Sequence, residues 1–106
     1  MVFVAGQIGW DTDHSFPDAS MAGQVEQTLK NTIAVLAQAD AGPEHIVRMT
    51  WYITSRTEYL VQIKDIGRIW REVMGKNYPA MAVIEISALI ESTAKVEIET
   101  TAVVPR

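Results

Sequence analysis

Residues 79–99, PAMAVIEISALIESTAKVEIE, decide the fold of this chain. The stretch begins with the apolar run 82–86, crosses a short polar segment at 91–93 and ends with the strict alternation 95–99. β-Branched residues at buried positions are typical of strands, and the polar residues between the two runs are typical of a turn. The stretch therefore predicts two strands that pair with each other as a β-hairpin.

The second of these strands separates apolar from charged side chains. Its period of two places Val96 and Ile98 toward the core, and it places Lys95, Glu97 and Glu99 on the opposite face. Two carboxylates that lie two residues apart on a sheet repel each other unless water solvates them, cations pair with them or a functional site employs them. This face is therefore either an ordinary solvated surface or the wall of a functional site.

Length and composition limit the class of protein. A chain of 106 residues with 48% hydrophobic content predicts one domain with a single core. The net charge of −4 argues against a nucleic-acid surface, and no apolar run approaches the length of a membrane span. The absence of cysteine excludes disulfides and thiolate chemistry. Because the start of the sequence does not resemble a signal peptide, we expect a cytoplasmic protein.

The first half of the chain predicts a strand followed by a helix. The strand starts almost at residue 1 and runs into Gly6 and Gly9, which permit a bulge or a close backbone approach. A helix capped by Asp18 or Ser20 should run to about residue 39, with an apolar stripe on one face and Gln24 on the other. The loop between strand and helix, 11–18, has a D-x-D-H spacing that could hold a metal, but turn chemistry is the simpler interpretation.

The second half predicts another strand and another helix before the hairpin. Along the strand at 46–54, one alternating set is fully apolar and should face the helices: Val47, Met49, Trp51 and Ile53. The second helix should be capped by Thr57 and end at Gly75. Gly67 lies in the buried stripe of this helix, where it would allow close packing against the sheet despite a propensity cost of about 1 kcal/mol.

This order of elements predicts an α+β fold, a two-layer sandwich in which two helices pack on one face of a mixed β-sheet. The other face of the sheet is then uncovered within one chain. Trp10, Tyr52 and the neighbouring isoleucine and valine residues give it enough apolar area to favour self-association.

The same segments resemble a known family. Residues 79–84, Leu89 and residues 96–99 are similar to the C-terminal signature of the reactive intermediate deaminase family, also called YjgF or L-PSP-like. The resemblance extends to residues 3–8, to the first helix and to residues 47–54. It implies one chorismate-mutase-like domain over residues 1–106, assembled as a homotrimer with clefts between subunits. The family's usual opening segment, with a tyrosine that reaches the cleft, is expected to be absent.

The resemblance also implies a chemistry. Members of this family hydrolyse enamines and imines to carbonyl compounds and ammonia without a metal or organic cofactor. By position, Glu97 would orient the attacking water, and backbone groups at Gly6 and Gln7 would hold the substrate. The arginine with which the family grips a substrate carboxylate is Met81 here. Methionine offers no charge and no donor, so residue 81 cannot bind a carboxylate in that way.

Two functions follow from this departure. The first is hydrolysis of imines or enamines with a non-carboxylate or otherwise atypical substrate, in a cleft walled by Met81, Val83 and either Trp10 or Tyr52, with Glu97 as general base. The alternative is a trimer that binds a small metabolite without chemistry, since methionine adapts to irregular apolar ligands. Both imply copies of the chain and a small molecule as partners, and neither needs a metal, a cofactor, nucleic acid or a membrane. Ribonuclease activity, another label in the family, is disfavoured by the acidic charge.

Each candidate also has a structural interpretation. Met81 could belong to the core, Glu97 could pair with Lys95 or Arg48 across the sheet, and Gln7 could cap a turn.

Overall fold

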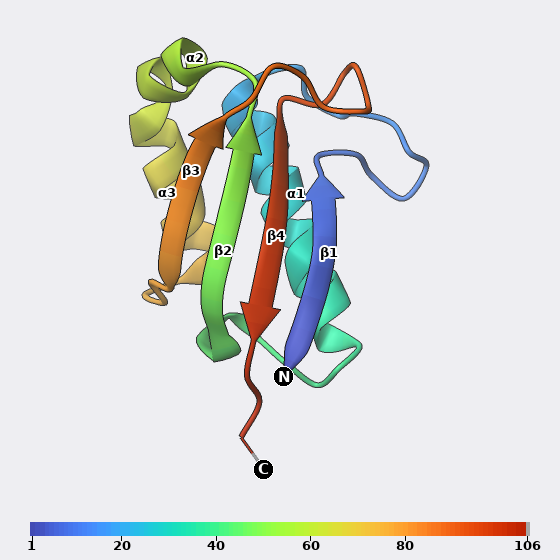
Figure 1. Cartoon of the computed structure of the whole chain (residues 1–106), viewed down its shortest axis with the longest axis vertical. Helices are drawn as coiled ribbons and strands as arrows, with labels where there is room; N and C mark the ends of the chain where they lie inside the picture. Colours follow the sequence, from blue (N-terminus) through green and yellow to red (C-terminus); the bar gives the residue numbers. More distant parts are fainter. Residues whose placement is uncertain (106) are drawn as a thin grey trace.

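Strand β4 (Val96–Ala102) lies between β1 (Val2–Ile8) and β2 (Ile46–Ile53), and β3 (Ala80–Glu85) lies outside β2 (Figure 1). These four strands form one sheet in the computed structural model, which describes residues 1–105. The remaining elements are helices α1 (Met21–Ala37), α2 (Arg56–Val61) and α3 (Ile63–Met74), and a 3₁₀ turn at Pro43–His45.

The two C-terminal strands form where the sequence predicts them, but the prediction that they pair with each other is wrong. Strand β3 pairs in parallel with β2, whereas β4 pairs antiparallel with both β1 and β2. Parallel neighbours need a crossover connection, and α2 and α3 provide it between β2 and β3. Residues 86–95 then carry the chain past the end of β2, so that β4 enters the sheet on the other side of that strand.

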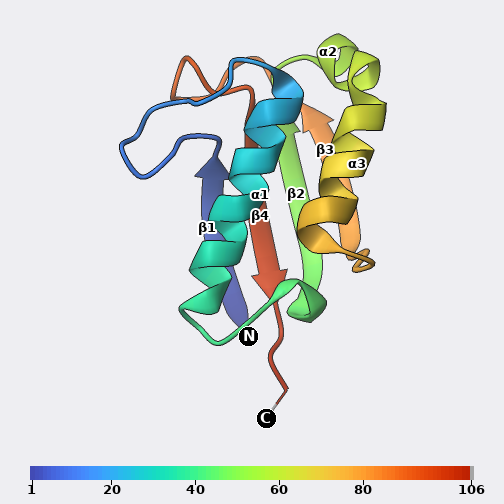
Figure 2. The same cartoon turned by 180° about the vertical axis from the view of Figure 1, so that it is seen from behind.

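The helices cover one face of the sheet, as predicted. Seen from behind, α1 crosses in front of β1 and β4, and α3 lies in front of β2 and β3 (Figure 2). The apolar stripe of α1 is buried against the inward side chains of the sheet, among them Met49, Trp51, Val96 and Ile98. The observed fold is therefore the predicted α+β sandwich. None of the helices within residues 1–105 is long and apolar enough to cross a membrane.

The predicted inward face of β2 needs one correction. Met49, Trp51 and Ile53 are buried, but Val47 is 47% exposed and Ile46 is buried in its place. The register between β2 and β4 shifts between Ile46 and Arg48. Such an irregularity inserts one residue and moves the side chains before it to the other face.

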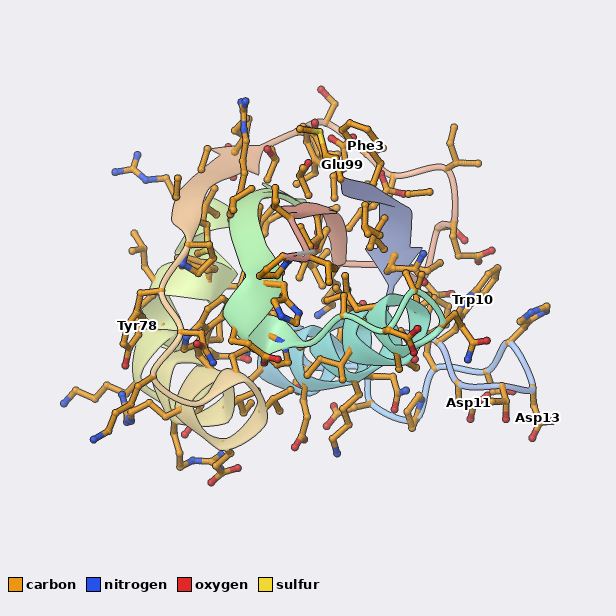
Figure 3. The ribbon with its side chains drawn as sticks, turned by 90° about the horizontal axis from the view of Figure 1, so that it is seen from below. Phe3, Trp10, Asp11, Asp13, Tyr78 and Glu99 are labelled. Atoms are coloured by element: carbon orange, nitrogen blue, oxygen red, sulfur yellow. The ribbon has the colours of Figure 1, made fainter. Side chains whose placement is uncertain are left out.

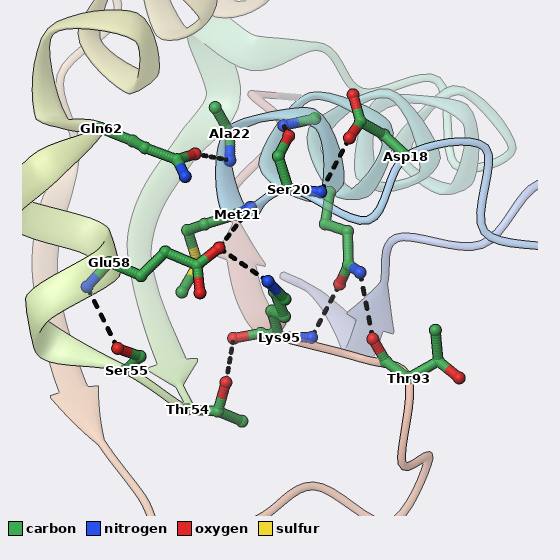
Figure 4. Close-up of polar contacts among 12 residues, drawn as sticks. Asp18, Ser20, Met21, Ala22, Thr54, Ser55, Glu58, Gln62, Thr93 and Lys95 are labelled. Carbon is green, nitrogen blue, oxygen red and sulfur yellow. Dashed lines mark hydrogen bonds and ion pairs between the residues drawn. The ribbon is translucent and has the colours of Figure 1, made fainter.

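The second predicted helix is divided into α2 and α3. Two side chains at this division accept hydrogen bonds from the start of α1 (Figure 4). Ser55, rather than Thr57, caps α2. The backbone leaves the helical region at Gln62, whose side-chain oxygen accepts from the N–H of Ala22 at 2.8 Å. Glu58 accepts from the N–H of Met21 at 3.1 Å. The first N–H groups of a helix have no partner within it, so α2 completes the hydrogen bonding of α1.

Ser20 is the residue that caps α1, because its hydroxyl accepts from the N–H of Gly23 at 3.0 Å. Asp18 lies two residues earlier, and its carboxylate accepts from the N–H of Ser20 at 2.7 Å. This hydrogen bond, together with one from the Ser20 hydroxyl, holds the pKa of Asp18 below its usual value of 3.8.

Asp18 is expected to make stability depend on pH in the acid range. A depressed pKa in the folded state contributes stability that is fully present above pH 3.8 and is lost as the pH falls through the folded-state value. Urea unfolding measured from about pH 6 to about pH 2 should therefore show a smaller acid loss for Asp18→Asn than for the wild type. Parallel curves for the two proteins would contradict this assignment.

Candidate functional site

Glu97 lies on the face of the sheet that the helices do not cover. Val96 and Ile98 on either side of it are fully buried, so the alternation predicted for this strand is confirmed. Figure 3 shows Glu99 and Phe3 on the same uncovered face. In the sheet, Glu97 is the partner of Ile8 on β1 and of Tyr52 on β2.

A cleft of about 360 Å³ opens beside Glu97. Its walls come from the end of β1, from the residues that follow it and from the segment before β4: Gly6, Gln7, Ile8, Trp10, Leu89, Ile90, Glu91 and Glu97. Four of the residues predicted for the site therefore share one cleft within a single chain.

Gly6 decides how Glu97 lies in this cleft. A Cβ atom at residue 6 would stand 2.7 Å from Cδ of Glu97 and 2.9 Å from its Cγ, closer than real Cβ contacts. The register between β1 and β4 shifts between Val4 and Gln7, so Gly6 lies within an irregularity of the ladder. Only glycine lets the carboxylate side chain rest on the backbone at this point, as the sequence had suggested for a close approach.

The other end of the cleft is held by Asn31, which was not among the predicted site residues. The Asn31 side chain on α1 donates to the carbonyls of Ile8 and Trp10 at 2.9 and 2.8 Å. The Trp10 ring stacks on His14 with centroids 4.5 Å apart. Gln7 donates to the carbonyl of Ala5 at 3.0 Å, and both residues lie within strand β1, so this bond does not cap a turn. The sequence gives no signal of this role of Asn31, because polar residues are common on the exposed face of any amphipathic helix.

Met81 and Val83 lie elsewhere. Their sheet partners are Met49 and Trp51, so they are on the face that the helices cover, on edge strand β3. Met81 is 44% exposed and therefore not a core residue. Since β2 separates β3 from β4, one chain cannot bring Met81 beside Glu97.

Tyr52 does not line the cleft beside Glu97, and its side chain contacts Glu99 instead. Its hydroxyl donates a short hydrogen bond to Glu99, and this bond raises the pKa of Tyr52 above its ordinary value. Lys95, offered above as a partner of Glu97, instead pairs with Glu58 at 2.7 Å. Within residues 1–105, no cationic side chain lies within 4.0 Å of the Glu97 carboxylate.

The D-x-D-H loop has a local explanation. One carboxylate oxygen of Asp11 accepts from the N–H groups of Asp13 and Ser15, at 2.9 and 3.1 Å, as in an Asx turn. In the part of the chain that the structure describes, no three His, Asp or Glu side chains are grouped so that they could hold a metal ion.

The sequence was compared with known proteins. The protein-family model described as "Endoribonuclease L-PSP" matches residues 1–104. The RutC family protein y4sK of Sinorhizobium fredii is 34% identical over 100 residues, which cover 93% of this chain and 75% of that protein. Protein DfrA of Myxococcus xanthus is 32% identical over 108 residues, covering 97% of this chain and 76% of the relative.

The fold was compared with solved structures. YyfB from Yersinia pestis, described as a protein of unknown function of the conserved Rid protein family, aligns with a TM-score of 0.86 at 27% identity. The alignment covers 97% of this chain and 77% of that one. A mixed sheet with helices on one face is thus shared with these proteins. Since the family match covers all but the last two residues, this chain belongs to the Endoribonuclease L-PSP family, also called the YjgF or Rid family.

Proposed function

We propose that this protein hydrolyses reactive imines or enamines to carbonyl compounds and ammonia. The observation that carries the proposal is the position of Glu97: its carboxylate rests on Gly6 in an open cleft and has no ion-pair partner among residues 1–105. A carboxylate within reach of a bound water can act as a general base. Membership of the family supports this chemistry over other uses of the same fold.

The reaction balances with water as the only co-reactant. Glu97 takes a proton from water while the water oxygen bonds to the imine carbon and the π bond between carbon and nitrogen breaks. Glu97 then gives that proton to the nitrogen, which yields a carbinolamine. The proton of the carbinolamine hydroxyl then passes to the nitrogen, the C–N bond breaks with loss of ammonia, and the oxygen becomes the carbonyl. An enamine enters the same path after protonation at carbon gives the imine.

We propose that the complete site forms between copies of the chain, in a homotrimer. Glu97 and Met81 lie on opposite faces of the sheet, on strands separated by β2, so a site that uses both must draw them from different chains. The uncovered face supports association, because Phe3 is 74% and Ile84 45% exposed. Strand β3 is exposed along its whole length at the sheet edge, which natural proteins usually cover or pair.

The substrate should be atypical for the family, because Met81 and Val83 present no charge or donor to it. A carboxylate attached directly to the imine carbon would find no guanidinium at residue 81. Losing such a contact at a desolvated site costs on the order of 2–5 kcal/mol. We therefore expect the small 2-imino acids to be poor substrates.

The test is ammonia release by the purified protein from two freshly generated imines of similar size. One carries a carboxylate on the imine carbon and the other is uncharged. We expect the uncharged imine to be hydrolysed well above its rate in buffer, and the 2-imino acid to be accelerated less. If neither reaction is accelerated, the hydrolase proposal loses its support, and the alternative, a trimer that binds a small metabolite without chemistry, is favoured over it.

Ribonuclease activity, which the family description names, has less support here. The net charge is −4, whereas nucleic-acid surfaces gather basic residues. The two histidines, His14 and His45, lie before and after the 17-residue helix α1, so they do not form a catalytic pair.

A further inference from the structure

A second cavity, of about 330 Å³, lies between α3 and edge strand β3. Four aromatic residues line it: Trp51, Tyr59, Trp70 and Tyr78. The Trp70 ring stands 6.1 Å from that of Trp51 and stacks on that of Tyr78 at 6.5 Å, measured between centroids. Figure 3 shows Tyr78 on the opposite side of the molecule from Trp10. Aromatic walls of this kind favour a planar, largely apolar guest.

Gly67 keeps this cavity open. The expectation that Gly67 allows close packing of the helix on the sheet is wrong: a Cβ atom there would meet only Nη1 of Arg71, at an ordinary 3.6 Å. Glycine inside a helix is less favourable than alanine, because it loses more backbone freedom. Gly67 therefore disfavours the helix and is not needed for helix packing. Its lack of a side chain leaves space in the wall of the cavity.

Among residues 1–105, Arg71 is the only charged residue that lines this cavity. Its guanidinium folds back over Gly67, one helical turn earlier. Within residues 1–105, no carboxylate lies within 4.0 Å of it, whereas Arg68 on the same helix pairs with Glu72 at 3.0 Å and with Asp65 at 3.9 Å. An unpaired guanidinium can hold a carboxylate through two parallel N–H···O bonds.

We propose that this cavity binds an aromatic molecule that carries a carboxylate, with the ring against Trp70 and Tyr78 and the carboxylate on Arg71. The inference rests on the proposed function and deepens it, because Met81, which the proposed site between chains would take from this strand, lines the same cavity. The anion would then be held from helix α3 instead of from residue 81. An exposed ion pair contributes little alone, so the ring supplies most of the affinity and Arg71 supplies the preference for an acid. A small 2-imino acid lacks that ring.

The test is calorimetric titration with 3-phenylpropanoate and with its uncharged amide, 3-phenylpropanamide. The wild type should bind the acid about three- to tenfold more tightly than the amide. Arg71→Gln should bind the two equally, and the control Arg68→Gln should keep the wild-type preference. Gly67→Leu should bind neither, because the new side chain fills the cavity, while its unfolding midpoint should equal or exceed that of the wild type.

Three outcomes would overturn the inference: no binding of either compound by the wild type, an unchanged preference in Arg71→Gln, or undiminished binding by a folded Gly67→Leu. Neither compound contains an imine, so the titration does not depend on catalysis. A protein that binds the acid and releases no ammonia contradicts only the proposed hydrolysis. One that hydrolyses imines and does not bind the acid contradicts only this inference.

Discussion

Replacing Glu97 by glutamine should slow ammonia release from an accepted imine by at least about 100-fold, because an amide cannot take the proton from the attacking water. The substitution keeps the size of the side chain and removes only its basicity. Steady-state rates of ammonia release at saturating imine would measure the effect on kcat. Thermal unfolding of the same samples would show that the fold is unchanged. A variant with the wild-type rate would end the hydrolase proposal.

Glu99→Gln is the matched control, since Glu99 lies two residues further along the same strand and on the same face. It touches Tyr52 instead of the cleft, and its replacement should leave the rate within about threefold of the wild type. Gly6→Ala is a second probe of Glu97. The added methyl group would stand 2.7 Å from Cδ of Glu97, so it must displace the carboxylate. Such a displacement costs up to about 100-fold in rate.

Replacing Gln24 by methionine should destabilise the protein by about 2–4 kcal/mol, the largest effect on stability that we expect. Gln24 is 1% exposed, although the helical pattern had placed it on the polar face. Its amide donates to the carbonyl of Thr93 at 3.0 Å and accepts from the N–H of Lys95 at 2.7 Å. Methionine has a similar length and can satisfy neither group, so two backbone groups lose their partner.

Urea unfolding would measure this loss, with Gln27→Met as the control. Gln27 lies one turn away, is half-buried and bonds only to the Asn31 side chain, at 2.9 Å. Its replacement should cost no more than about 1 kcal/mol. Equal losses in the two variants would show that the bonds to residues 93 and 95 do not set the stability. Since those residues lead directly into β4, we also expect Gln24→Met to lower activity by loosening Glu97.

Local pattern was enough to predict most individual elements. Alternation placed Val96 and Ile98 inward and Glu97 outward, because the period of a strand depends on the backbone alone. Ser20 was one of two caps expected for α1, and side-chain capping is likewise a contact over three residues. The match to the family also followed from short segments, read in order along the chain.

Contacts between distant segments could not be predicted in this way. The sequence predicted that β3 and β4 would pair, because they are neighbours in the chain, but β2 lies between them. The division between α2 and α3 coincides with bonds from Glu58 and Gln62 to the start of α1, about 40 residues away in sequence. Gln24 looked exposed because helix periodicity does not show that a loop will later cover that face.

The sequence by itself determined the fold class, the family, and which residues carry charge or lack it: residue 97 is a glutamate and residue 81 is a methionine. These are properties of side-chain type and of short repeats. Only the tertiary structure decided that Gly6 supports Glu97, that Met81 faces away from it, and that Arg71 lies over Gly67 beside an aromatic cavity. Each of these depends on the strand order and on how helices pack on the sheet. Chain order alone does not specify either one, because both follow from contacts between segments remote in sequence.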